Sequence, residues 1–362
     1  MRRLLVIAAL AAAVGTMAAA QERVVNVYNW SDYIDPQVLE LFSKETGIKV
    51  RYDTFDANET LETKLLAGKS GYDVVVPTGY FLQRQIQATV FQKLDKSKLP
   101  NLVNVWPEVA KRLAVYDPGN QYAVNYMWGT TGIGYNIKAM HERLGANATI
   151  DSWDVVFKPE LLAKFKTCGI HMLDSADDII PAALHYLGLD PNSAKPADLD
   201  KAAALMAKIR PNVRKFHSSE YLNALASGEI CLVVGWSGDI KQAQKRAAEA
   251  KNGVDIGYVI PKEGAQMFFD NLAIPKDAPH PAEALAFIDF LLRPDVAAKN
   301  SDMVAYANGN LASQKLIDKK VLDDPGIYPS ADTMSHLYTV EARSPQAQRL
   351  INRMWTRVKT GR

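Results

Sequence analysis

Apolar runs and amphipathic segments alternate along the N-terminal third of the chain. Residues 24–28, 48–52 and 73–76 are short, mostly apolar runs, and the third is nearly all valine, as expected for a strand that is buried on both faces. Two segments with a helical spacing of apolar residues separate these runs. This β-α-β-α-β order predicts a mostly parallel sheet that is covered by helices.

The two helical segments carry residues that mark helix ends. The first begins with Asp35 as its N-cap and Pro36 in its first turn, and it ends at Gly47. In the second segment, Asp56 and Glu59 have the spacing of a capping box. We therefore expect a helix to begin at each of these acidic residues.

The pattern restarts near Trp128-Gly129 and continues through the second half of the chain. In chain order we expect a strand at 131–135, a helix at 196–209, strands at 231–234, 256–261 and 268–274, and a helix at 281–292. Two sheets joined by two apolar crossover strands predict an α/β protein with two lobes. The expected bounds are 21–128 plus 259–306 for lobe 1 and 129–258 plus 307–362 for lobe 2.

The first twenty residues have the composition of a signal peptide. Arg2 and Arg3 form a short basic region, residues 4–14 are apolar, and Ala18-Ala19-Ala20 supplies the small residues of a cleavage site. The apolar run is too short to span a bilayer as a helix. No cysteine lies near the cleavage site, so we expect no lipid anchor there. The sequence thus predicts residues 1–20 as a cleavable signal peptide and the Gram-negative periplasm as the compartment.

The charge composition limits the classes of partner. The 362-residue chain has 42 Lys and Arg against 40 Asp and Glu, and loss of residues 1–20 removes two arginines and no acid. The mature chain is therefore formally neutral, which argues against nucleic acid or an anionic membrane as the main partner. No later stretch approaches the roughly eighteen apolar residues of a membrane span.

The sequence contains two cysteines, Cys168 and Cys231. In an oxidising compartment such a pair favours a disulfide, and two separate buried thiols are the alternative. The pair does not form a CxxC motif, so the pattern does not support redox catalysis or a zinc site.

The sequence lacks the motifs that would indicate an enzyme. Gly235-Trp236-Ser237-Gly238 resembles a nucleophile elbow, but its second glycine falls one residue early. The six histidines include no HExxH motif, and Gly132 and Gly134 lack the third glycine of a dinucleotide-binding loop. We therefore predict no catalytic residues, no metal site and no cofactor.

Three short motifs pair an aromatic residue with an aspartate beside a predicted strand. They are Trp30-Ser31-Asp32-Tyr33, Trp236-Ser237-Gly238-Asp239 and Phe268-Phe269-Asp270. Ligands of α/β sheets bind beyond the carboxyl ends of the strands, so we expect the motifs to face a crevice at three strand ends. The alternative for each motif is that the tryptophan is a core residue and the aspartate caps a helix.

This combination of side chains suits an aliphatic diamine. Aromatic faces attract cations, and carboxylates accept charge-assisted hydrogen bonds from ammonium groups. An amine with a lysine-like pKa is protonated at neutral pH, so the ligand would be a dication. We therefore expect apolar walls for its methylene groups and an acid at each end.

Longer stretches of the sequence resemble the periplasmic polyamine-binding proteins of ABC transporters, and among them the putrescine receptors. The resemblance runs over essentially the whole mature chain. It is carried by NVYNWSDYI, VVVPTGYFLQRQ, LDSADD, FHSSEYLNALASGEICLVVGWSGD, FFDNLAIP and YANGN. It implies a type II substrate-binding fold in which two α/β lobes, joined by a two-strand hinge, close over a ligand. It also implies a monomeric receptor whose partner is a membrane permease.

The resemblance further implies which residues contact the polyamine. The expected walls of an aromatic box are Trp30, Trp236, Phe268 and Tyr306. The expected acids are Asp32, Asp178, Asp239 and Asp270. The expected polar contacts are Ser31, Thr78, Tyr80 and Ser218. Cys168 and Cys231 match the disulfide of the family.

Four positions bear on which polyamine is bound. Asp178 stands where the putrescine type typically has the longer glutamate, and Tyr80 stands where the spermidine type has a tyrosine. Ser175 stands where a spermidine receptor would have a further acid, and Asp239 is a feature of the putrescine type. We therefore expect putrescine in preference to spermidine, with cadaverine as a further candidate. A polyamine sensor of the same fold and, less favoured, an exported amine-modifying enzyme are the alternative functions.

The number of acids predicts an imbalance of charge in the cleft. Four ionised aspartates would carry four negative charges, whereas a diamine brings two positive ones. Neighbouring carboxylates in a partly desolvated cleft raise each other's pKa. We expect one of the four either to have a basic counter-ion or to hold a proton in the empty protein, unless the cleft is wet enough for all four to ionise.

Overall fold

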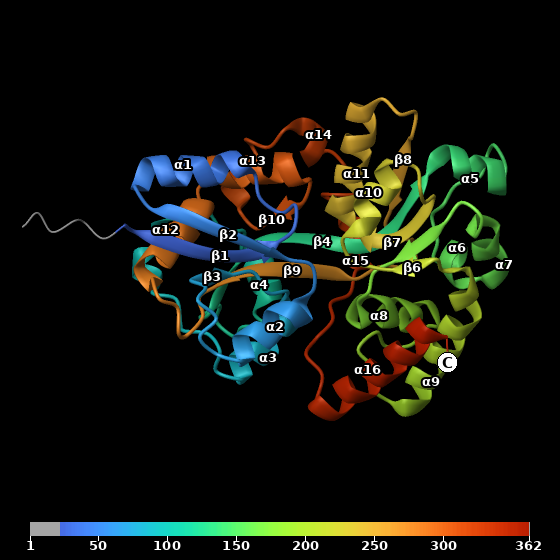
Figure 1. The fold of residues 1–362 in the computed structure, drawn as a ribbon, viewed down its shortest axis with the longest axis horizontal. Helices are drawn as coiled ribbons and strands as arrows, with labels where there is room; N and C mark the ends of the chain where they lie inside the picture. The colour runs from blue at the N-terminus through green and yellow to red at the C-terminus, as the bar shows by residue number, and fades with distance from the viewer. Residues whose placement is uncertain (1–21, 362) are drawn as a thin grey trace, which may run out of the picture.

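The computed structural model describes residues 22–361, which form two lobes side by side along the longest axis of the molecule (Figure 1). The predicted signal peptide lies outside the described residues. Ten strands form one sheet in the order β2-β1-β3-β9-β4-β7-β5-β6, in which β8 and β10 also pair with β4. The long strand β4 passes from one lobe into the other (Figure 1).

The bounds of the elements follow the printed sequence. The strands are β1 (Val24–Trp30), β2 (Lys49–Phe55), β3 (Val74–Val75), β4 (Ala123–Asn136), β5 (Ile170–Met172), β6 (Lys215–Phe216), β7 (Leu232–Trp236), β8 (Ile256–Val259), β9 (Met267–Ala273) and β10 (Ala307–Asn308). The α-helices are α1 (Pro36–Thr46), α2 (Asn58–Leu66), α3 (Gly79–Gln87), α4 (Pro107–Leu113), α5 (Ile137–Leu144), α6 (Asp154–Phe157), α7 (Pro159–Leu162), α8 (Ala176–Tyr186), α9 (Pro196–Ile209), α10 (Glu220–Ala226), α11 (Ser237–Ala250), α12 (Pro281–Leu291), α13 (Pro294–Val304), α14 (Lys319–Leu322), α15 (Ala331–Ser335) and α16 (Pro345–Thr360).

One predicted helix start is confirmed and the other is wrong. Asp35 caps α1 by accepting a hydrogen bond of 2.9 Å from the Gln37 backbone N–H, and the helix ends at Gly47 with φ of 67°. α2 instead follows Ala57, whose side chain makes no capping hydrogen bond. The side chains of Asp56 and Glu59 line a cavity, so they do not form the capping box that their spacing predicts.

The prediction of mostly parallel sheets holds only within each lobe. β1 pairs in parallel with β2 and β3, and β5 pairs in parallel with β6 and β7. Every antiparallel pair includes one of the two crossing strands, β4 or β9. The sheet is therefore mixed, because the strands that join the lobes run against the strands of both.

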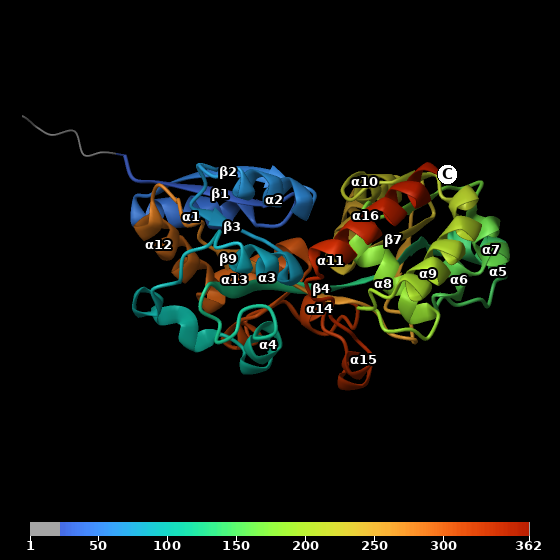
Figure 2. The same ribbon diagram turned by 90° about the horizontal axis from the view of Figure 1, so that it is seen from below.

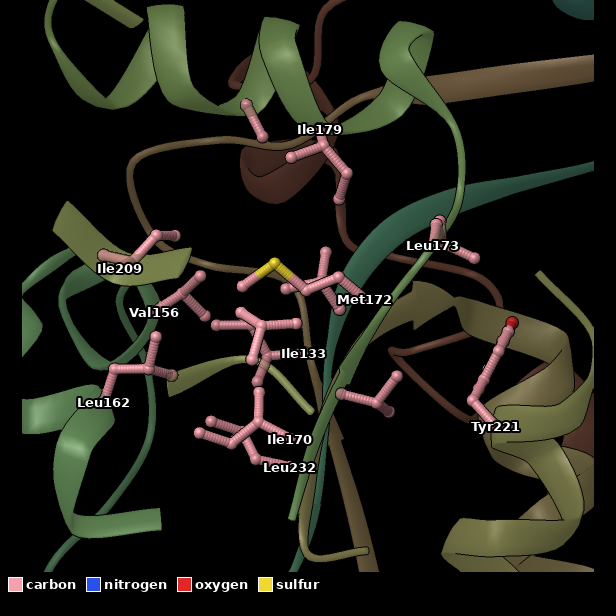
Figure 3. Close-up of a cluster of buried hydrophobic side chains, with 14 of the residues drawn as sticks. Ile133, Val156, Leu162, Ile170, Met172, Leu173, Ile179, Ile209, Tyr221 and Leu232 are labelled. Atoms are coloured by element: carbon pink, nitrogen blue, oxygen red, sulfur yellow. The ribbon is translucent and has the colours of Figure 1, made fainter. Parts of the chain in front are cut away.

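The buried apolar side chains form two large clusters and a smaller one. One large cluster takes its residues from 25–127 and 268–306, and the other from 133–265 and 351–358. Figure 3 shows part of the second cluster, in which Val156 and Ile209 lie on one side of the strands and Tyr221 lies on the other. The two clusters give each lobe its own core. The predicted lobe bounds remain a prediction.

β4 shows how the two cores are connected. The strand leaves the first cluster after Met127 and enters the second at Ile133, without a break in between. The sequence pattern suggested a new start near Trp128-Gly129, which is wrong because this part of β4 is continuous strand. α13 and α11 lie next to each other at the boundary of the lobes, as seen from below in Figure 2.

Cys168 and Cys231 form a disulfide, as predicted, with their Cα atoms 5.6 Å apart. Cys231 immediately precedes β7, and the bridge ties it to the segment that leads into β5. The disulfide therefore packs against the core of the second lobe, next to the start of the strand that ends at Trp236.

Replacing both cysteines by serine should lower the free energy of unfolding by about 2–4 kcal/mol, because the bridge restricts the unfolded chain. Urea denaturation of the non-reduced wild type and of the double variant measures the difference. Mass spectrometry after alkylation without reductant is the control, and two alkylated thiols in the wild type would contradict the assigned bridge.

Candidate ligand-binding cleft

One cavity lies between the two lobes and is lined by residues of both. Its volume is about 770 Å³ when its opening to solvent is included. All twelve residues that we expected to contact a ligand line it: Trp30, Ser31, Asp32, Thr78, Tyr80, Asp178, Ser218, Trp236, Asp239, Phe268, Asp270 and Tyr306. Their role in binding a ligand stays a prediction.

Two of the three aromatic–acid motifs lie at strand ends as expected. β1 ends at Trp30, whose indole N–H donates a hydrogen bond of 2.9 Å to the Val76 carbonyl, and the turn that follows carries Asp32 with φ of 54°. β7 ends at Trp236, and α11 begins with the next residue. Asp239 therefore lies in the first turn of α11, where the helix dipole favours a negative charge.

The third motif does not lie at a strand end, so that expectation is wrong. Phe268 and Asp270 lie inside β9, and Asp270 also forms an antiparallel bridge with Thr78. β9 is one of the two strands that cross between the lobes, and its residues Phe268 and Asp270 line the cavity. Its side chains therefore reach the cavity from the middle of the strand.

Four aromatic rings form a chain along the cavity. The rings of Trp30 and Trp236 meet edge to face, with centroids 5.6 Å apart. Phe268 lies 6.4 Å from Trp236 and 6.3 Å from Tyr306, measured between ring centroids. The four rings thus come from both lobes and provide apolar walls with electron-rich faces.

Asp270 is buried and accepts one hydrogen bond on each carboxylate oxygen. The hydroxyl of Thr78 donates to Oδ1 at 2.6 Å, and the hydroxyl of Tyr33 donates to Oδ2 at 2.8 Å. Burial raises the pKa of Asp270 to about 7, although the two hydroxyls lower it, and the charges of Asp178 and Asp239 raise it further. At neutral pH the empty cleft therefore holds Asp270 partly protonated.

Asp239 is held in the same way by two tyrosines. Tyr221 donates to Oδ2 at 2.8 Å, and Tyr306 donates to Oδ1 at 2.7 Å. Burial is the largest cause that raises the pKa of Asp239 to about 6, and the nearby charge of Asp32 adds to it. The two tyrosines orient the carboxylate without adding a positive charge.

Whereas Asp239 is half-buried, Asp178 is buried like Asp270 and lies in the first turn of α8. The hydroxyl of Thr131 donates to its Oδ1 at 2.6 Å, and the indole N–H of Trp236 donates to the same oxygen at 3.2 Å. Burial raises the pKa of Asp178 as well. Within residues 22–361, none of Asp178, Asp239 and Asp270 forms a salt bridge with a basic side chain.

Asp32 differs from the other three acids because it has a basic counter-ion. Its Oδ1 lies 2.8 Å from a guanidinium nitrogen of Arg246, which confirms the counter-ion prediction for this acid. One turn earlier on α11, the amide of Gln242 donates to the carbonyls of Asp32 at 3.2 Å and Val304 at 3.0 Å. One face of α11 therefore contacts the opposite lobe through three side chains, those of Asp239, Gln242 and Arg246.

The described residues offer no other chemistry that competes with the acids and rings. Among them, no group of three or more His, Cys, Asp or Glu side chains is placed to hold a metal ion. No helix in the same part of the chain is both long and apolar enough to cross a membrane.

Comparison with known proteins identifies the family. A model of the bacterial extracellular solute-binding proteins matches residues 37–329. The chain belongs to this family. The putrescine-binding periplasmic protein SpuD of Pseudomonas aeruginosa is 54% identical to this solute-binding protein over 98% of the chain and 96% of SpuD. The corresponding protein of Escherichia coli, PotF, is 52% identical over 98% of the chain and 96% of PotF.

Solved structures agree with the architecture of this solute-binding protein. A putative spermidine/putrescine ABC transporter protein from Listeria monocytogenes superposes with a TM-score of 0.84 at 33% identity, over 94% of this chain and all of that one. The two-lobed α/β fold expected from the sequence is thereby confirmed.

Several residues of the cleft in this solute-binding protein were not singled out from the sequence. Tyr33 and Tyr221 hold the carboxylates of Asp270 and Asp239, and both lie within motifs that carry the resemblance. They could have been found by asking which hydroxyls satisfy a buried acid. The other cavity-lining residues that were not predicted as ligand contacts are Phe55, Asp56, Ala57, Asn58, Glu59, Asp174, Ser175, Ser219, Leu222 and Gln266.

The raised pKa values predict that a diamine expels a proton when it binds. The ammonium groups favour ionised Asp270 and Asp239, so binding near pH 7 should release protons, and affinity should fall as the pH drops through about 7 to 6. Titration calorimetry in two buffers of different ionisation enthalpy measures the release. At pH 8.5 both acids are already ionised, which provides the control. Equal observed enthalpies in both buffers at pH 7 would contradict the prediction.

Proposed function

We propose that this protein is a periplasmic receptor that binds putrescine between its lobes and delivers it to a membrane ABC importer. The observation that carries the proposal is a set of three aspartates in the cleft, buried Asp178 and Asp270 and half-buried Asp239, that have hydroxyl and indole partners but no salt bridge to a described basic side chain. A buried carboxylate without a cation costs several kcal/mol, so the cleft is built for a cation that comes from outside.

The aromatic walls support a ligand with an aliphatic chain. Putrescine has a charged nitrogen at each end and four methylene groups between them, which match acids along a cavity lined by Trp30, Trp236, Phe268 and Tyr306. We propose that the twelve cavity residues expected from the sequence are the contact residues. We also propose that Asp178, Asp239 and Asp270 meet the ammonium groups, with Asp32 held by Arg246 at the closing edge.

Two observations bear on the choice of polyamine. The relatives of 54% and 52% identity carry putrescine in their names, which supports putrescine for this chain. Tyr80 lines the cavity and is the feature that favours spermidine as the second candidate. The putrescine proposal takes precedence because Asp239, the feature of the putrescine type, lines the cleft and has two tyrosine hydroxyls as its hydrogen-bond partners.

The remaining parts of the proposal concern location and partners. We propose that residues 1–20 are removed on export, that the mature receptor acts as a monomer and that it has no catalytic activity. Its macromolecular partner would be the permease of an importer, and nucleic acid has no role. A receptor that presents its ligand-bound form to a signalling protein would use the same cleft. A transport assay with the permease of the importer would distinguish import from signalling.

Asp270→Asn should bind putrescine about thirtyfold to several thousandfold more weakly than the wild type. The variant removes one partner of a desolvated charge pair, a change that costs about 2–5 kcal/mol. Titration calorimetry at pH 8 measures the dissociation constants. Asp151→Asn, which changes an exposed acid outside the cavity, is the matched control. An Asp270→Asn constant within about threefold of the wild type would exclude the proposed site.

A further inference from the structure

Gln266 is a buried polar residue that lines the cleft and has no assigned role. Its side chain contributes to the wall of the cavity, and the residue is only 1% exposed. Its Oε1 atom has no hydrogen-bond partner among the described residues. A buried amide oxygen that stays unpaired is destabilising, so a hydrogen-bond donor from outside the chain would stabilise it.

The backbone places Gln266 beside Asp178. The amide N–H of Thr131 donates to the Gln266 carbonyl at 3.0 Å, and the hydroxyl of the same threonine donates to Asp178 at 2.6 Å. Tyr338 pairs with the residues on either side of Gln266, since the Met267 amide donates to its carbonyl at 2.8 Å and its own amide donates to Ala265 at 3.1 Å. These bonds fix the position of Gln266 in the segment where the chain crosses between the lobes.

Asp178 alone does not provide enough hydrogen-bond acceptors for an ammonium group. Its Oδ1 already receives the Thr131 hydroxyl and the Trp236 indole N–H. An ammonium group has three N–H donors, which a single carboxylate cannot all accept in good geometry. A neutral carboxamide oxygen supplies a further acceptor without adding another negative charge to a cleft that seven acidic residues already line.

We propose that Gln266 contacts the bound ligand and accepts a hydrogen bond from the ammonium group that pairs with Asp178. This inference rests on the proposed function and adds a contact that positions the ligand beside Asp178. The contact selects ligands whose end group at Asp178 carries several N–H donors, as a primary ammonium does. Gln266 is thus a determinant of how the ligand is oriented as well as of affinity.

The chain offers a matched control for the test. Gln85, in α3, is also fully buried, and both polar atoms of its amide lack partners within residues 22–361, but it does not line the cavity. Gln266→Met and Gln85→Met each replace a buried amide by an apolar side chain of similar length. Only the first should change ligand binding if the amide contacts the ligand.

Titration calorimetry of the full mature chain with putrescine provides the first measurement. Gln266→Met should bind about five- to thirtyfold more weakly than the wild type, and Gln85→Met should bind within about twofold of it. Equal affinities for Gln266→Met and the wild type would overturn the inference while the proposed function stands. Absence of putrescine binding by the wild type itself would instead remove the proposed function and this inference with it.

A crystal structure of the wild-type complex with putrescine separates a contact from a purely structural role and does not depend on the folding of a variant. The inference predicts a ligand nitrogen at a hydrogen-bond distance of about 2.7–3.2 Å from the Gln266 amide. A Gln266 amide that instead bonds to water or to Tyr338, with the ligand nitrogen beyond about 4 Å, would overturn it.

Discussion

Two buried carboxylates, Asp178 and Asp270, and the half-buried carboxylate of Asp239 lie in the cleft without a salt bridge to a described basic residue, and the rest of the structure is organised around that constraint. Transfer of an ion from water into a protein interior costs several kcal/mol, which the fold must offset or leave for a ligand to offset. Hydroxyl and indole donors orient each acid but do not neutralise it. The raised pKa values follow from this arrangement, and so does the expected preference for a dication.

The two-lobed architecture makes such an arrangement tolerable. The carboxylates line a cavity that opens to solvent between the lobes, so a ligand can reach them there. One face of α11 joins the lobes beside this cavity, because its first turn carries Asp239 and its next turns reach Asp32 through Gln242 and Arg246. The same helix face therefore supplies both an acid of the cavity and contacts with the opposite lobe.

Much of the fold could be predicted from local patterns. The cap of α1, the helix at 196–209 and the buried strands of both lobes follow from short-range spacing and apolar runs. The course of β4 could not be predicted, because a strand that serves two cores has no local signal at Trp128-Gly129. The capping box at Asp56 failed for a related reason, since a cavity-lining role competes with a local cap for the same side chain.

The candidate site was predicted more completely than the elements that build it. All twelve expected residues line one cavity, because aromatic–acid motifs and the family resemblance both carry chemical information. The supporting residues were harder to find. Tyr221 in α10 reaches Asp239 in the neighbouring α11, and Gln266 lines the cavity from the residue just before β9, so neither position has a spacing that identifies it.

The central claim is that the cleft recognises two separated ammonium groups, and a comparison of ligands of equal length tests it most directly. Titration calorimetry of the wild type with putrescine, butan-1-amine and butane-1,4-diol keeps the four-carbon chain and removes one or both charges. Each lost ammonium leaves a buried acid unpaired, which costs about 2–5 kcal/mol, so butan-1-amine should bind at least about thirtyfold more weakly than putrescine and the diol more weakly still. A monoamine or diol that binds within about threefold of putrescine would contradict the account.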